Sequence, residues 1–104
     1  MKITLKQFFE DFPKRQAVIH CRTEEQALIL LKAFHKMGKC WCNGQSYLGK
    51  SYWEERRENI VYSNGGQYGN IQYSRNNHHT IFEFEDVILD EYIEKLKDFI
   101  RSKK

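Results

Sequence analysis

The chain has 104 residues, which suits one domain with a modest hydrophobic core. Its 17 basic and 14 acidic side chains give a formal net charge of only +3. A dedicated DNA-binding domain usually carries a clustered basic stripe and a higher pI. Charged residues make up 30% of the chain and aromatic residues 14%, a composition that indicates a folded protein and excludes a disordered tail.

Two further features bear on where the protein acts. No run of 18 apolar residues is present, so the sequence predicts no membrane span. The chain contains three cysteines, an odd number, and its first residues carry no long apolar stretch of the secretion-signal type. We therefore expect reduced thiols and a cytoplasmic location.

A short helix is the first predicted element. Thr4 and Gln7 have the spacing of a capping box, which marks a helix start at Thr4. Pro13 ends this helix, because the residue before a proline is pushed out of helical geometry. The apolar, β-branched residues 17–21 then predict a buried strand.

The next element is a long helix around which the rest of the chain is organised. Thr23 and Gln26 form a second capping box, and Gly38 is placed to end the helix in a left-handed conformation. Between them, apolar residues recur at helical spacing on one face, namely Ala27, Leu30, Leu31, Phe34 and Met37.

The middle of the chain is predicted to be less regular. Residues 40–42 read as a second short strand or the approach to one, and Asn43-Gly44 is a turn signal. Residues 45–58 are interpreted as irregular, with one helical turn over residues 52–57.

Three strands are predicted next, over residues 59–63, 68–74 and 80–85. The glycine-rich residues 64–67 favour a tight hairpin turn between the first two. We expect these strands to form a meander, followed by a helix over residues 89–101 that packs on the core or, as an alternative, forms a homodimer.

These elements together predict an α+β fold in a single domain, residues 1–104. We expect a mostly antiparallel sheet of about four to five strands, covered by helices on one face.

Cysteine and histidine residues raise the question of a zinc site or a catalytic dyad. Cys40 and Cys42 are one residue apart, which differs from the usual spacing of structural zinc ligands, although Cys21, His78 or His79 could join them. A Cys42–histidine pair would need hydrogen-bond contact that a sequence cannot show. No nucleophile or phosphate-loop motif is present, so the leading hypothesis is a non-enzyme without metal or cofactor, and a zinc protein or Cys/His enzyme remains an alternative.

The segment of residues 43–79 is rich in Tyr, Asn, Gly, Ser and Gln. This composition is typical of a recognition surface, because tyrosine gives a large contact area at low entropic cost, but an ordinary hairpin with strand tyrosines would look similar. Tyrosine, tryptophan and arginine are the usual interface anchors. The predicted binding residues are Tyr47, Tyr52, Trp53, Arg56, Arg57, Tyr68, Tyr73 and Arg75.

The same arginines and tyrosines could instead bind a nucleic acid or nucleotide. They would supply phosphate contacts and stacking platforms. Glu54, Glu55 and Glu58 neutralise part of that basic cluster, so this function is kept as an alternative.

Residues 17–88 also carry a resemblance in their layout. Val18 to Ala27 (VIHCRTEEQA) is followed by Gly38-Lys39-Cys40-Trp41, by a Tyr/Gly/Asn-rich hairpin and by Ile81 to Phe84 (IFEF). This order resembles small accessory proteins of phages and prophages of Gram-positive bacteria, a group that includes anti-CRISPR inhibitors. The resemblance implies a stoichiometric inhibitor that binds a host defence protein, for example a CRISPR nuclease, in the bacterial cytoplasm. It brings no catalytic residue with it.

Overall fold

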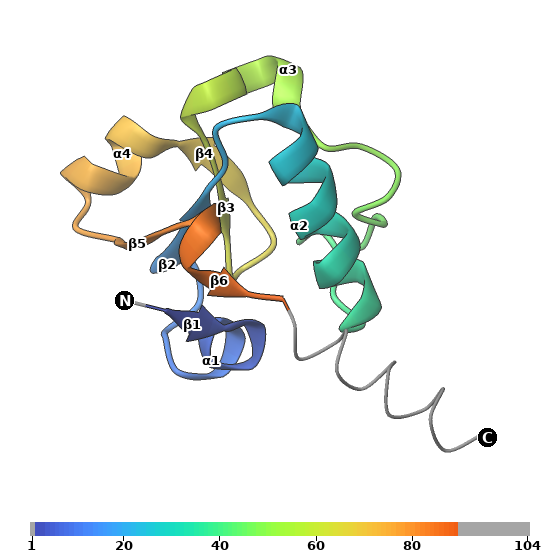
Figure 1. Ribbon diagram of the computed structural model, residues 1–104, viewed down its shortest axis with the longest axis horizontal. Helices are drawn as coiled ribbons and strands as arrows, with labels where there is room; N and C mark the ends of the chain where they lie inside the picture. The colour runs from blue at the N-terminus through green and yellow to red at the C-terminus, as the bar shows by residue number, and fades with distance from the viewer. Residues whose placement is uncertain (1, 90–104) are drawn as a thin grey trace.

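The computed structural model describes residues 2–89, and its centre is a four-stranded mixed sheet (Figure 1). Two of the three strand pairings are antiparallel, and the pairing of β2 with β5 is parallel. From one edge to the other the order is β4 (Tyr68–Asn70), β3 (Ile60–Ser63), β2 (Ala17–His20) and β5 (Thr80–Glu83).

A separate two-stranded parallel sheet joins the two ends of the described chain. In it, β1 (Ile3–Thr4) pairs with β6 (Val87–Ile88), with Ile3 opposite Val87. Both of these facing side chains are buried, so the pairing extends the hydrophobic core beyond the main sheet.

The two N-terminal helices begin where the sequence predicts. In α1 (Leu5–Glu10), the Thr4 hydroxyl accepts a hydrogen bond from the backbone N–H of Gln7, and the Gln7 side chain accepts one from the N–H of Thr4. In α2 (Glu24–Lys36), the Thr23 hydroxyl accepts from the backbone N–H of Gln26, and the Gln26 side chain accepts from the N–H of Arg22 instead of that of Thr23. Gly38 follows the helix with a φ of 81°, the left-handed conformation expected after a helix C-terminus.

The main core lies between the sheet and helices α1 and α2. Alternate strand residues point toward these helices, including Ile19, Tyr62 and Phe82. Phe8 of α1 stacks on Phe34 of α2 with ring centroids 5.9 Å apart. The predicted α+β fold with a mostly antiparallel sheet is therefore confirmed.

The opposite face of the sheet carries a smaller apolar cluster. There Val18 and Val61 pack with Ile71 of a short helix, α4 (Ile71–Asn76). Figure 1 shows α2 and α4 on opposite sides of the sheet. This short helix is an addition to the predicted architecture.

The prediction of a strand over residues 68–74 is wrong beyond Asn70. The Asn70 side chain accepts a hydrogen bond from the backbone N–H of Gln72 at 2.7 Å, so it caps α4. The chain then crosses over and places β5 beside β2, with Ile81 opposite Val18. The expected three-strand meander is for this reason replaced by a parallel pairing.

Two other predicted strands also differ from the structure. Residues 40–42 lie in a loop in which the predicted Asn43-Gly44 turn is present, closed by a hydrogen bond from Gly44 N to Trp41 O. The strand predicted over residues 80–85 is β5, which ends at Glu83 and is followed by a 3₁₀ turn, η2 (Phe84–Asp86).

The predicted C-terminal helix and its role in a homodimer lie outside the described residues, apart from Leu89. None of the helices within residues 2–89 has the length and apolar character needed to cross a membrane.

Candidate functional site: an aromatic pocket beside the hairpin

The loop between α2 and α3 (Trp53–Arg56) is fixed by two buried aromatic side chains and one backbone contact. The indole N–H of Trp41 donates to the carbonyl of Lys50 at 3.0 Å, and the hydroxyl of Tyr62 donates to the carbonyl of Ser51 at 2.7 Å. The N–H of Cys42 donates to the carbonyl of Gly66 in the hairpin turn at 2.9 Å. These bonds set the position of the residue that follows Ser51, which is Tyr52.

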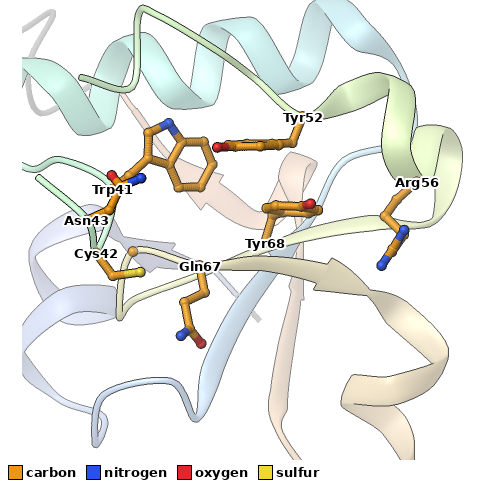
Figure 2. Close-up of a pocket in the computed structure, with 8 residues that line it drawn as sticks. Trp41, Cys42, Asn43, Tyr52, Arg56, Gln67 and Tyr68 are labelled. Carbon is orange, nitrogen blue, oxygen red and sulfur yellow. The ribbon is translucent and has the colours of Figure 1, made fainter. Parts of the chain in front are cut away.

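Tyr52 stacks on Tyr68, which lies in the hairpin formed by β3 and β4. The ring centroids are 4.3 Å apart and the planes differ by 11°. Trp41 meets the Tyr52 ring edge-on, with centroids 5.0 Å apart. Figure 2 shows the two tyrosine rings lying parallel, with Trp41 beside them. Both tyrosines are half-buried, so part of the stack faces solvent.

Tyr52 has a left-handed backbone conformation, with a φ of 60°. This region is costly for a residue with a Cβ and persists only where the surroundings enforce it. The bonds to Lys50 and Ser51 on its N-terminal side and the stack with Tyr68 supply that enforcement. Strain of this kind often accompanies a binding site.

Positive charge lies over both stacked rings. The ammonium of Lys50 is 4.7 Å from the centroid of the Tyr52 ring, and the guanidinium of Arg56 is 5.8 Å from that of the Tyr68 ring. A pocket of about 430 Å³ opens beside them, and no carboxylate occurs among its described lining residues. Its wall includes Trp41, Asn43, Tyr52, Arg56, Gln67 and Tyr68.

The structure brings three of the predicted binding residues together, because Tyr52, Arg56 and Tyr68 line this pocket. Two others lie nearby in sequence: Trp53 packs partly against the core, and Arg57 pairs with Glu54 at 3.6 Å on the surface.

The remaining predicted residues lie elsewhere. Tyr73 and Arg75 belong to α4, on the other side of the sheet, and both are exposed. Tyr47, which was also among the predicted binding residues, does not lie at the surface. It is 3% exposed and packs against Trp41 and Phe34 in the core. Burial raises the pKa of its hydroxyl to about 12.

Sequence reasoning missed Trp41, Asn43 and Gln67 as pocket residues. Both turns that carry them were predicted, one at residues 43–44 and one at residues 64–67. The contact between these turns, from Cys42 to Gly66, is a tertiary contact, and no local sequence pattern predicts it.

The cysteines and histidines of the metal and enzyme hypotheses are dispersed. Cys21 is buried, and this burial raises its pKa, while Cys40 and Cys42 are exposed. Cys42 lines the aromatic pocket, whereas His79 lies against Ser74 in a different pocket. Within residues 2–89, no three His, Cys, Asp or Glu side chains are grouped so that they could hold a metal ion.

A polar cluster fixes the segment that carries Arg56 and Arg57. His20 Nδ1 lies 2.9 Å from a Glu83 carboxylate oxygen, which Arg22 also contacts at 3.1 Å. His20 Nε2 donates to the carbonyl of Glu58 at 2.7 Å, in the 3₁₀ turn η1 (Arg57–Asn59). The central strand thus anchors the end of the α3–η1 segment, which forms one side of the pocket.

Comparison with protein-family models, with curated proteins and with solved structures finds no match for this chain.

Proposed function

We propose that this chain is a protein-binding module, and that it contacts its partner through Tyr52, Tyr68 and Arg56, here called the stack surface. The stacked rings support this proposal most directly. They are held in place before any partner arrives, so binding would cost little ordering entropy. Tyrosine and arginine are also among the residues that most often dominate binding energy.

The charges of the stack surface indicate what kind of partner it fits. Arg56 and Lys50 are positive, and the described lining of the pocket holds no acid. A carboxylate next to an apolar side chain would satisfy both the cations and the ring edges. The proposed partner surface is therefore an acidic patch with an apolar centre.

The resemblance to phage accessory proteins supplies a class of partner. We propose a host bacterial defence protein, with a CRISPR nuclease as the first candidate, and inhibition by occupation of its surface. A stoichiometric inhibitor needs a rigid surface and no catalytic group, and the stack surface meets that need.

Nucleic-acid binding at this surface is the less favoured alternative. Base stacking needs an open ring face. Here the two tyrosines cover one another, and Lys50 and Arg56 lie over their rings. A nucleic-acid strand would first have to displace these contacts.

The test is co-purification from bacterial lysate, using tagged wild-type protein and the variants Tyr68→Ala and Arg56→Ala, with and without nuclease treatment. We expect wild type to retain a discrete protein after nuclease treatment and both variants to lose it. Purified CRISPR nucleases are then assayed for DNA cleavage with increasing amounts of the protein, and inhibition should saturate at equimolar ratio.

Tyr73→Ala is the matched control, because it removes an exposed tyrosine from α4 on the other side of the sheet. It should retain the partner. Equal retention by all variants, with circular dichroism showing that they are folded, would refute the stack surface as the binding site. A partner that disappears with nuclease treatment would support the nucleic-acid alternative.

A further inference from the structure

A second pocket, of about 200 Å³, lies on the α4 side of the sheet, and Gln67 and Tyr68 line both this pocket and the one beside the tyrosine stack. Val18 and Val61 contribute apolar wall, and Gly69 of β4 leaves space because it has no side chain. Arg15 and His79 reach it from two loops that are far apart in the sequence. Strand β4 and the hairpin turn therefore have a pocket on each side.

Hydrogen-bond donors dominate the polar lining of this second pocket. Arg15 provides a guanidinium, and Ser63, Tyr73 and Ser74 provide hydroxyls. No carboxylate is found among its described lining residues. The site therefore favours a ligand that accepts hydrogen bonds and carries negative charge.

Two side chains that line this pocket, Ser63 and His79, have hydrogen-bonding capacity left after their contacts within the protein. Ser63 Oγ accepts hydrogen bonds from the N–H groups of Gly65 and Gln67, at 3.2 and 3.1 Å, so its own hydrogen remains available. His79 Nδ1 lies 3.2 Å from Ser74 Oγ, which leaves Nε2 for another contact. Both groups belong to half-buried or buried residues, where an additional acceptor would be stabilising.

Backbone strain marks the same place independently. Arg15 has a φ of 73°, and its N–H donates to the Asn64 side chain at 2.7 Å. His78, the residue before His79, has a φ of 58°. Left-handed conformations at residues other than glycine are uncommon and cluster at binding sites.

We propose that this pocket binds a compact oxyanion, namely a phosphate group. A planar guanidinium matches two phosphate oxygens. The Ser63 hydroxyl can donate to another, and so can the Nε2–H of His79 when its Nδ1 accepts from the Ser74 hydroxyl. The volume exceeds that of several water molecules at about 30 Å³ each, so a small phosphate monoester fits as well as free phosphate. This inference does not rest on the protein-binding function proposed above.

The test is an NMR titration of ¹⁵N-labelled full-length protein with inorganic phosphate, with sodium chloride of equal ionic strength as the reference. We expect saturable shifts at the amides of Gly69, Ser74 and His79 and small ones at Asn43. A parallel titration with glycerol phosphate separates the two sources: tighter binding than inorganic phosphate indicates a phosphorylated small molecule, and equal binding indicates the free ion.

Two variants remove the site in different ways. Arg15→Gln keeps an exposed polar side chain and should weaken binding by about tenfold or more, because it removes a charge-assisted contact. Gly69→Val should abolish saturable binding by filling the pocket. A Cβ there would meet only Val61, at 3.9 Å, and the backbone has no positive φ, so the strand can accept the side chain.

Arg57→Gln is the matched control, because this exposed arginine pairs with Glu54 and is not among the lining residues of either pocket. It should bind phosphate as wild type does. Shifts that never saturate, or an affinity that Arg15→Gln leaves unchanged, would overturn the proposal. Equal weakening by Arg57→Gln would also overturn it, since the effect would then be one of net charge alone.

Discussion

The Tyr52 ring lies parallel to the Tyr68 ring at a centroid distance of 4.3 Å, and this contact joins the loop after α2 to the hairpin. Each ring is a wall of the pocket and a support for the other ring. The shape of the stack surface is therefore a property of the pair.

A double-mutant cycle on Tyr52→Ala and Tyr68→Ala should show coupling. Stacked aromatic pairs contribute about 0.5–1.5 kcal/mol beyond the area they bury, so the double variant should lose less stability than the sum of the single variants by that amount. Urea unfolding of the four proteins measures the coupling. A second cycle on Tyr52→Ala and Tyr73→Ala should give additive losses, because no contact joins those two residues; zero coupling in the first cycle would contradict the stacked arrangement.

Asn64 should be one of the most important polar residues for stability. Its side-chain N–H groups donate to the carbonyls of Phe12 and Pro13, both at 3.2 Å, and its Oδ1 accepts from Arg15 N at 2.7 Å. Asn64→Ala should cost about 2–3 kcal/mol, because it leaves several partly buried backbone groups without partners.

Urea unfolding measures the loss, and Asn43→Ala is the matched control. Asn43 is exposed and caps a turn by accepting from Gln45 N at 2.9 Å, so its replacement should cost less than about 1 kcal/mol. Equal losses for the two variants would show that the Asn64 contacts add nothing beyond an ordinary turn.

The positions of α1 and α2 could be predicted from this sequence because their start and stop signals are local. The Thr4 and Thr23 caps and the Gly38 stop occur where the capping pattern places them. The pairing of the strands was harder to predict from the sequence. Residues 71–74 alternate like a strand, but the Asn70 cap, a local signal that was missed, starts a helix there and moves β5 to the other edge of the sheet.

The residues of the site divide in the same way, into those that residue type suggests and those whose position depends on contacts between distant segments. Tyr52, Arg56 and Tyr68 could be proposed from residue type alone, whereas Tyr47 has the same composition signal and is buried. Which tyrosines face solvent depends on where Trp41 packs, and that follows from contacts between distant segments.

Alkaline pH should destabilise the fold through its buried thiol and phenols. Burial raises the pKa of Cys21 from 9.0, raises that of Tyr62, and raises that of Tyr47 from 10.0 to about 12. These groups keep their protons in the folded state at a pH where the unfolded chain releases them. Their contribution is complete below about pH 9 and is lost as pH rises through the folded-state values, by up to about 1.4 kcal/mol per pH unit for each group.

Urea unfolding between about pH 7 and pH 11 measures this loss. Cys21→Ala should be less stable than wild type at neutral pH, because it leaves a small cavity, yet its stability should fall less steeply above the ordinary cysteine pKa of 9.0. Identical slopes for the two proteins would mean that Cys21 ionises alike in the folded and unfolded states.

Gly66 is the position where the two turns that form the pocket wall come closest. Its φ is 80°, and a Cβ there would lie 2.7 Å from the backbone nitrogen of Cys42. Gly66→Ala therefore combines an unfavourable backbone conformation with a clash against a main-chain atom that cannot rotate away, and it should cost about 2–4 kcal/mol.

The Gly66→Ala substitution should also disturb the stack surface. Moving Cys42 strains the loop that places Trp41, so the Trp41 indole N–H resonance should shift as its bond to the Lys50 carbonyl lengthens. Gly69→Ala is the matched control in the same hairpin, because its Cβ would meet only Val61 at 3.9 Å, and it should change stability by less than about 1 kcal/mol. If Gly66→Ala is as well tolerated as Gly69→Ala, then the two turns are not in contact, and the aromatic pocket loses the support on which its rigidity depends.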